Sequence, residues 1–304
     1  MGVIDVNASN VSQTGFFCYM SKRKTEGHRR KLAWVTARFG EGMRIKMLDL
    51  SLGERGFIEY IPGEYAWRPV FAEGYMFIHC LWVVGKSKGR GFGALLLDEC
   101  IRDAKEAGMN GVAMVTSEGS WLAGKRLLLG QGFEVVGEAP PSFSLVVKRF
   151  GSAPPPSLPS DWNERAARFG AGVTIIRTDQ CPYFEDAAKS VTETAQQKGL
   201  SVKVVEFGSS AEVRERAPSP YGTYSVLLNG KVVGYDYLAA QELQKQAQQN
   251  DQKPQMNTDG HGWSSFCVHL RLSVVSLHRS TVPSDTLCAA CTTARRRPPY
   301  RPCS

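Results

Sequence analysis

A glycine-rich turn between a predicted strand and a predicted helix restricts the fold of this chain more than any other feature. Residues 75–84 are rich in aromatic and β-branched side chains, which predicts a strand, and residues 91–106 have apolar positions at helical spacing. The turn between them reads Gly-Lys-Ser-Lys-Gly-Arg-Gly-Phe-Gly. Backbone N–H groups at a helix N-terminus attract anions, and glycines let a ligand approach the backbone closely. The segment therefore predicts an anion site within an α/β fold.

The charge and spacing of this turn narrow the choice of anion. Lys86, Lys88 and Arg90 add positive charge to the helix dipole, which suits a pyrophosphate. A P-loop is excluded because no Gly-Lys-Ser/Thr follows Gly93. A dinucleotide fingerprint fits poorly because the turn follows a long N-terminal region instead of an initial βαβ unit. A tight strand-to-helix connection without a ligand remains the alternative interpretation.

Strand and helix patterns divide the chain into four zones. Residues 1–150 alternate between the two, with helices expected over 29–39 and 120–129 and strands over 44–50, 56–61, 111–116 and 143–150. Residues 151–160 are rich in Pro and Ser, which predicts an extended linker. Residues 161–240 predict a smaller α/β unit of strand, helix, strand and hairpin. Residues 241–304 begin with a Gln-rich stretch and then lose all pattern, which predicts a disordered tail.

Composition limits the partners. The net charge is +8, and residues 251–304 supply half of it, with seven Lys/Arg against three Asp (7 − 3 = +4). The remainder is only mildly basic, so we expect no nucleic-acid surface. No run of 18 apolar residues and no basic start followed by an apolar stretch occurs, so we expect neither a membrane span nor a secretory signal. A cytoplasmic protein whose eight cysteines are free thiols is the prediction.

Two motifs resemble those of a known family. Lys88-Gly89-Arg90-Gly91-Phe92-Gly93 resembles the Gln/Arg-x-x-Gly-x-Gly/Ala turn of GNAT N-acetyltransferases, and Gly132-Phe133 resembles the Gly-Phe after that family's last helix. Over about residues 16–238 the chain is similar to GNAT proteins that carry a C-terminal YoaP-type domain. The resemblance implies a GNAT mixed sheet flanked by helices over residues 14–150. It also implies a thioredoxin-like domain over residues 161–240.

The resemblance further implies acetyl-CoA as co-substrate and acetyl transfer to an amine of a small molecule or a protein. Backbone groups of Leu81, Trp82 and Val83 would pair with the pantetheine arm where two strands splay apart. The amides of the turn would hold the pyrophosphate, at Lys88, Gly89, Arg90, Gly91, Phe92, Gly93 and Ala94. The family often has a tyrosine four residues before the Gly of Gly-Phe, as the acid for the departing thiolate. Here that position is Leu128, so the general acid is missing.

Acid–base candidates lie on the strands before the turn. His79 is the first candidate for a general base, because an imidazole titrates near neutral pH. We expect it to share a face with Phe77 and Leu81, with Cys80 on the opposite face. Glu59 is the second candidate, as holder of a cationic amine or as a proton relay. A histidine packed within a sheet and a solvated hairpin edge are the alternative interpretations.

Acceptor-binding candidates come from the same region. Glu64 is expected to help hold the amine, and Tyr60 and Tyr65 to wall the acceptor pocket. An ordinary aromatic core is the alternative for the tyrosines. No metal site is expected, because Cys288-Ala-Ala-Cys291 lacks a second ligand pair at zinc spacing.

The second unit carries one cysteine of chemical interest. Cys181-Pro182-Tyr183 resembles the opening of a glutaredoxin-type motif, but Phe184 replaces the second cysteine and excludes a dithiol cycle. Cys181 could still be a thiolate with a lowered pKa, since helix N-termini favour that form. Two other functions therefore stay open: a CoA-binding, partner-recruiting module without turnover, and a monothiol redox protein acting through Cys181. The sequence does not define the oligomeric state.

Overall fold

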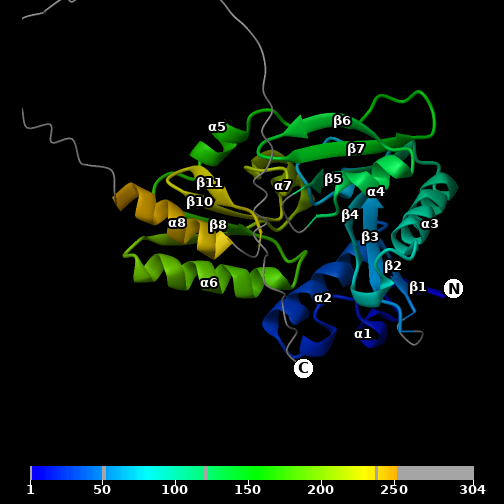
Figure 1. The fold of residues 1–304 in the computed structure, drawn as a ribbon, viewed down its shortest axis with the longest axis horizontal. Coiled ribbons are helices and arrows are strands. Elements are labelled where there is room, and N and C mark those ends of the chain that lie inside the picture. Colours follow the sequence, from blue (N-terminus) through cyan, green and yellow to red (C-terminus); the bar gives the residue numbers. More distant parts are fainter. Residues whose placement is uncertain (1, 50–52, 119–121, 237–238, 252–304) are drawn as a thin grey trace, which may run out of the picture. The chain divides into compact units, whose positions relative to one another are not determined.

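Two β-sheets form the framework of the described chain (Figure 1). The computed structural model describes residues 2–49, 53–118, 122–236 and 239–251, all within one compact unit that spans Met1–Pro254. Most of the predicted tail, including Cys288 and Cys291, lies outside the described residues. None of the helices in the described ranges is long and apolar enough to cross a lipid bilayer.

The first sheet is mixed and has seven strands in the order β1-β2-β3-β4-β5-β7-β6. Among its described strands, only β4 and β5 pair in parallel. Its strands are β1 (Val3–Val6), β2 (Arg44–Leu48), β3 (Gly56–Pro62), β4 (Met76–Val83), β5 (Gly111–Ser117), β6 (Glu134–Ala139) and β7 (Phe143–Arg149). Its helices are α1 (Val11–Thr14), α2 (Glu26–Phe39), α3 (Phe92–Glu106) and α4 (Lys125–Gly130). This is the mixed α/β fold with a large, helix-flanked sheet that the sequence predicts.

Helices α2 and α3 cover opposite faces of this sheet, with α3 alongside β2–β4 in Figure 1. Side chains alternate between the two faces along a strand. On β3, Ile58 and Tyr60 belong to the buried apolar cluster that includes α3. Phe57 and Ile61 belong to the cluster that includes Trp34 of α2. The sheet therefore separates an α3 side from an α2 side.

Strand β4 has two irregularities that matter for the site. It pairs with β5 only from Met76 to Ile78, and the two strands separate beyond that point. A β-bulge at His79 shifts the register against β3, so that Glu59 pairs with Cys80 but the next residue of β3 pairs with Ile78. The extra residue reverses the alternation of the side chains that follow it.

The bulge corrects the predicted orientation of β4. Leu81 and Val83 belong to the α3 side, whereas Cys80 and Trp82 pack against the α2-side cluster. Leu81 therefore does not share a face with His79, and Cys80 does not lie opposite to it.

The second sheet has four strands in the order β11-β10-β8-β9. Its strands are β8 (Val173–Arg177), β9 (Val202–Glu206), β10 (Tyr224–Leu228) and β11 (Lys231–Gly234), and its helices are α5 (Trp162–Ala167), α6 (Tyr183–Gln197), α7 (Ser210–Arg216) and α8 (Ala239–Asp251). Strand β8 is parallel to β9 and antiparallel to β10. The β10–β11 turn holds Asn229 and Gly230 at φ 51° and 71°, which is the hairpin that the Asn-Gly pair predicts.

Several elements were not predicted. Strand β1 pairs with β2 upstream of the expected start of the first domain at residue 14. Strand β6 and helices α5 and α7 were also missed. The predicted helix over 120–129 is shorter, at Lys125–Gly130, and residues 119–121 are outside the described ranges.

The predicted tail also begins too early. Helix α8 (Ala239–Asp251) covers residues that were assigned to the tail. The helix packs on the second sheet, where Leu243 is fully buried in the apolar core.

Candidate functional site

The glycine-rich turn borders a cavity of about 320 Å³ on the α3 side, here called the turn-side cavity. Gly89 and Gly91 have φ values of 75° and 82°, a backbone conformation that favours glycine. The lining includes Leu81, Val83, Lys88, Gly89, Gly91, Phe92, Gly93 and Ala94, which are all the predicted cofactor-binding residues except Trp82 and Arg90.

The two exceptions face elsewhere. Arg90 is half-exposed and its Nη1 lies 2.6 Å from Glu54 Oε1. Trp82 lines a different cavity, because the bulge turns it to the α2 side.

That second cavity, of about 380 Å³, is here called the α2-side cavity. The segment before α2, the strands β3 and β4, and the loop before α6 all contribute to it. Its polar and thiol lining includes Cys18, Lys31, Glu59, Arg68, His79, Cys80, Gln180 and Cys181. Neighbouring residues Leu122 and Ala123 line the α2-side and the turn-side cavity respectively. The two cavities therefore flank the place where β4 separates from β5.

Glu59 is a buried, ionised carboxylate of the α2-side cavity. Lys31 Nζ lies 2.6 Å from its Oε2, with side-chain exposures of 3% and 2% for the lysine and the glutamate. Gln180 Nε2 donates to Glu59 Oε1 at 3.2 Å. Burial alone raises the pKa of Glu59, but the Lys31 ammonium, together with His79, outweighs it and lowers the pKa to about 2. A carboxylate with so low a pKa binds cations well and is a weak base.

His79 lines the same cavity but has no lone pair to offer. The backbone N–H of Trp67 donates to its Nε2 at 2.9 Å. Burial lowers the pKa of His79 to about 4, so the ring is neutral at pH 7 and carries its proton on Nδ1. Nδ1 lies 3.3 Å from Glu59 Oε1 without hydrogen-bond geometry. This arrangement does not favour His79 as the general base.

The predicted acceptor-binding residues are not brought together at this cavity. The Tyr60 hydroxyl donates to Asp103 Oδ2 at 2.6 Å on the α3 side, so Tyr60 is a core residue. Glu64 and Tyr65 belong to a 3-10 helix (Gly63–Tyr65) that does not line the cavity, and Tyr65 is 42% exposed. Leu128 is fully buried in the α3-side cluster. The structure therefore places Tyr60 in the core, and it leaves Glu64 and Tyr65 outside the lining of the α2-side cavity.

The loop before α6 carries Gln180 and Cys181 into the α2-side cavity. Burial raises the pKa of Cys181 to about 11, so the expected activated thiolate is not what the structure shows. The loop lies close to α2, since a Cβ built on Gly27 would meet Pro182 O at 2.1 Å. A glycine is required at this point of the helix for the two elements to touch.

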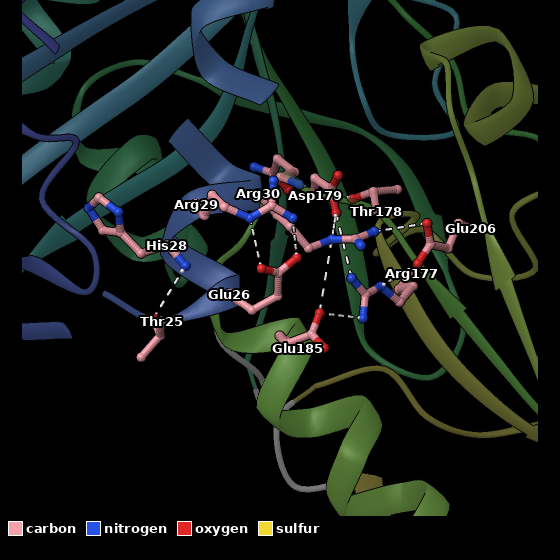
Figure 2. Close-up of polar contacts among 11 residues, drawn as sticks. Thr25, Glu26, His28, Arg29, Arg30, Arg177, Thr178, Asp179, Glu185 and Glu206 are labelled. Carbon is pink, nitrogen blue, oxygen red and sulfur yellow. Dashed lines mark hydrogen bonds and ion pairs between the residues drawn. The ribbon is translucent and has the colours of Figure 1, made fainter. Parts of the chain in front are cut away.

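An ion-pair network fastens the same loop to α2. Figure 2 shows Arg30 of α2 and Arg177 at the end of β8 among three carboxylates. Arg30 Nε lies 2.7 Å from Asp179 Oδ1, and Arg30 Nη2 lies 2.8 Å from Glu206 Oε2. Arg177 Nη1 lies 2.7 Å from Glu185 Oε2. The network thus joins β8, α6 and β9 to α2 beside the cavity.

Sequence reasoning missed several residues of the lining, among them Lys31 and Gln180. Cys18, Cys80 and Arg68 line the α2-side cavity but belong to no motif. Cys18, Cys80 and Cys181 are free and partly accessible, and burial raises the pKa of each. Within the described ranges, no group of three or more His, Cys, Asp or Glu side chains is arranged to hold a metal ion.

A curated relative defines the family. No protein-family model matches the chain. The relative is the Uncharacterized N-acetyltransferase YoaP of Bacillus subtilis (strain 168), which is 31% identical over 251 residues. The match covers 81% of this chain and 98% of the relative. The chain therefore belongs to the GNAT N-acetyltransferases, within the group that includes YoaP.

Solved structures give weaker similarities. A GNAT acetyltransferase of Staphylococcus aureus Mu50 matches with a TM-score of 0.37 and 13% identity, covering 49% of this chain and 99% of that one. The PaiA N-acetyltransferase of Thermoplasma acidophilum in complex with coenzyme A matches with a TM-score of 0.35 and 13% identity, covering 49% and 100%. Aminoglycoside 6'-acetyltransferase type Ii matches with a TM-score of 0.38 and 16% identity, covering 51% and 100%.

Proposed function

We propose that this chain is an N-acetyltransferase that moves an acetyl group from acetyl-CoA to an amine of a small molecule or a protein. The separation of β4 from β5 beside the glycine-rich turn carries this proposal. It leaves strand backbone without a β5 partner next to an anion site, and it lies between two cavities that open on opposite faces. One cavity suits the co-substrate and the other suits the acceptor.

The co-substrate is assigned to the turn-side cavity. The backbone of residues 81–83 pairs with the amide groups of the pantetheine arm, as an added strand would. The amides of residues 88–94 and the N-terminus of α3 hold the pyrophosphate. The side chains of Leu81 and Val83 contact the arm, whereas Trp82 contributes its backbone alone because its side chain faces the other cavity.

The acceptor amine is assigned to the α2-side cavity. As the neutral amine, its nitrogen attacks the thioester carbonyl carbon, the carbon–sulfur bond breaks, and CoA leaves as a thiolate that takes up, through water, the second proton lost by the nitrogen. Glu59 holds the ammonium form and receives one of its protons through water, while Lys31 and Gln180 position Glu59 and His79 lines the cavity beside it. Since Glu59 is a weak base, positioning of amine and thioester supplies most of the rate.

The order of the second sheet supports a domain assignment. Residues 14–150, extended upstream by β1, form the GNAT domain, and residues 151–160 form the linker. Residues 161–240 form a YoaP-type, thioredoxin-like domain, which α8 completes. Strand order β11-β10-β8-β9 with parallel β8 and β9, and a cysteine before α6, support this assignment. The proposed location is the cytoplasm, where acetyl-CoA is available.

A redox function through Cys181 is less favoured. With a pKa of about 11, Cys181 supplies little thiolate at neutral pH. A CoA-binding module without turnover remains the competing function, because Leu128 supplies no acid for the departing thiolate.

Release of free CoA thiol from acetyl-CoA in the presence of an amine panel tests the proposal with the full chain. We expect acetyl-CoA to bind and at least one amine to accelerate thiol release above the amine-free control. Glu59→Gln is expected to slow the reaction without weakening acetyl-CoA binding. Binding of acetyl-CoA without release for every amine would support the module instead.

A further inference from the structure

A guanidinium without a carboxylate partner is buried in the α2-side cavity. Arg68 is 3% exposed. Its Nη1 donates to the Trp67 carbonyl at 3.0 Å, to Gln180 Oε1 at 2.9 Å and to Thr223 Oγ1 at 3.0 Å. Its Nη2 donates to the His79 carbonyl at 3.3 Å. Every one of these acceptors is neutral, and no carboxylate of the described residues forms an ion pair with Arg68.

The charges around Arg68 leave room for an anion. Among the residues that the structure describes, four basic ones line the cavity, Lys22, Lys31, Arg55 and Arg68, against the single carboxylate of Glu59. Lys31 already neutralises that carboxylate. A buried charge is costly unless an opposite charge reaches it. The cavity is therefore complementary to a ligand that brings a negative group to Arg68.

Gln180 shows which hydrogen-bonding groups a ligand between Arg68 and Glu59 would need. Its amide oxygen accepts from Arg68 at 2.9 Å, and its amide nitrogen donates to Glu59 at 3.2 Å. One small group thus presents an acceptor to the guanidinium and a donor to the carboxylate. An α-amino acid presents the charged version of the same pair, a carboxylate acceptor and an ammonium donor only slightly farther apart.

We propose that the acceptor is an α-amino acid, or a small compound with a carboxylate next to its amine, whose carboxylate binds Arg68 and whose ammonium binds Glu59. This inference rests on the proposed acetyltransferase function. Aromatic side chains complete the wall, from Phe16, Phe57 and Trp82, which favours an apolar or aromatic side chain on the acceptor. The cavity of about 380 Å³ is near the lower end for small-molecule sites, so it suits one such molecule.

Matched compounds test this inference on the unmodified full chain. Phenylalanine is compared with phenethylamine, which lacks only the carboxylate, and with phenylalaninamide, in which it is neutral. Leucine and methionine are compared with their amides in the same way. A charge-assisted pair to Arg68 predicts kcat/KM about ten- to a hundredfold higher for the carboxylates. Equal or faster acetylation of the decarboxylated and amide forms would overturn the inference.

Variants locate the effect. Arg68→Gln is expected to bring the ratio of kcat/KM for phenylalanine to kcat/KM for phenethylamine close to one, whereas Arg68→Lys retains part of the preference for the carboxylate. Arg214→Gln is the matched control. Like Arg68, Arg214 donates a hydrogen bond that joins the part of the chain with the first sheet to the part with the second, here to the Glu64 carbonyl, but it does not line this cavity. Loss of preference in Arg214→Gln as well would argue against a direct contact at Arg68.

Equilibrium binding separates failure of this inference from failure of the proposed function. The same compounds are titrated by calorimetry into the full chain saturated with CoA. Tighter binding of phenylalanine than of phenethylamine, even with no turnover of any amine, supports the carboxylate site and rejects only the enzymatic function. Turnover of simple amines with no binding preference for any carboxylate supports the function and overturns the site.

Discussion

Replacing His79 with glutamine should make the protein less sensitive to mild acid. His79 has a fully buried side chain, and burial lowers its pKa from 6.5 to about 4. The unfolded chain therefore binds a proton at this residue between about pH 6.5 and pH 4, while the folded chain does not. Folding stability falls as the pH falls through this window, because the unfolded state holds more protons. Glutamine keeps an acceptor for the Trp67 N–H and removes the titration.

The size of the effect follows from the shift. One pKa unit corresponds to about 1.4 kcal/mol, so His79 should cost the wild type about 2 kcal/mol between pH 7.5 and pH 5, and about 3 kcal/mol by pH 4. Glu59, with a pKa of about 2, stays ionised at both of the higher pH values. The comparison at pH 7.5 and pH 5 thus isolates the histidine.

Urea unfolding of both proteins at these two pH values measures the effect. The wild type should lose about 2 kcal/mol more than His79→Gln over this interval, whatever the absolute stability of the variant. Parallel losses in the two proteins would refute the reasoning, because they would show that His79 is protonated in the folded state or is not buried as described.

Three further predictions concern the turn, the loop before α6 and the thiols. Gly91→Ala should weaken acetyl-CoA binding at least about tenfold and lower the free energy of unfolding by ~1 kcal/mol. Gly108→Ala, at a similar φ at the other end of α3, should lower the free energy of unfolding by the same amount without affecting binding. Calorimetry measures the binding, and urea unfolding measures the stability. Gly27→Ala, which drives a Cβ into the Pro182 carbonyl oxygen, should raise the KM for the acceptor with little change in acetyl-CoA affinity. Gly40→Ala, whose Cβ makes only an ordinary contact, should change neither quantity. A steady-state comparison that finds no difference between the two variants would contradict the docking of the loop on α2. Alkylation of Cys181 in the folded protein at pH 7.5, followed by peptide mass mapping, should be about a hundredfold slower than that of an unperturbed thiol. A rate equal to or above that of the unfolded protein would contradict the burial of Cys181.

The elements around the glycine-rich turn could be predicted because their signals are local. Strand β4 and helix α3 begin and end within one residue of their predicted bounds. The hairpin at Asn229-Gly230 follows from the backbone preferences of two neighbouring residues. Helix α8 was missed because polar side chains dominate its sequence. Its burial depends on the sheet it packs against, which local pattern does not reveal.

The acceptor side could not be predicted because distant segments build it. Arg68 meets Gln180 and Thr223, which lie more than one hundred positions later in the chain. His79 could be found as a residue of the cavity, but its protonation state depends on the Trp67 amide and on burial. Tyr60 was misplaced because the sequence of β3 does not reveal which of its faces helix α3 covers.

The bulge at His79 has a consequence for how this strand tolerates insertions and deletions. Before it, β4 follows one alternation of side chains, and after it the opposite one. Deleting His79 would remove the bulge and leave Leu81 on the α3 side and Trp82 on the α2 side. Deleting Leu81 while the bulge stays would instead turn Trp82 toward the turn-side cavity and Val83 toward the α2-side cavity. The number of residues between the bulge and the glycine-rich turn should therefore vary less among functional relatives than the identity of most side chains on β4.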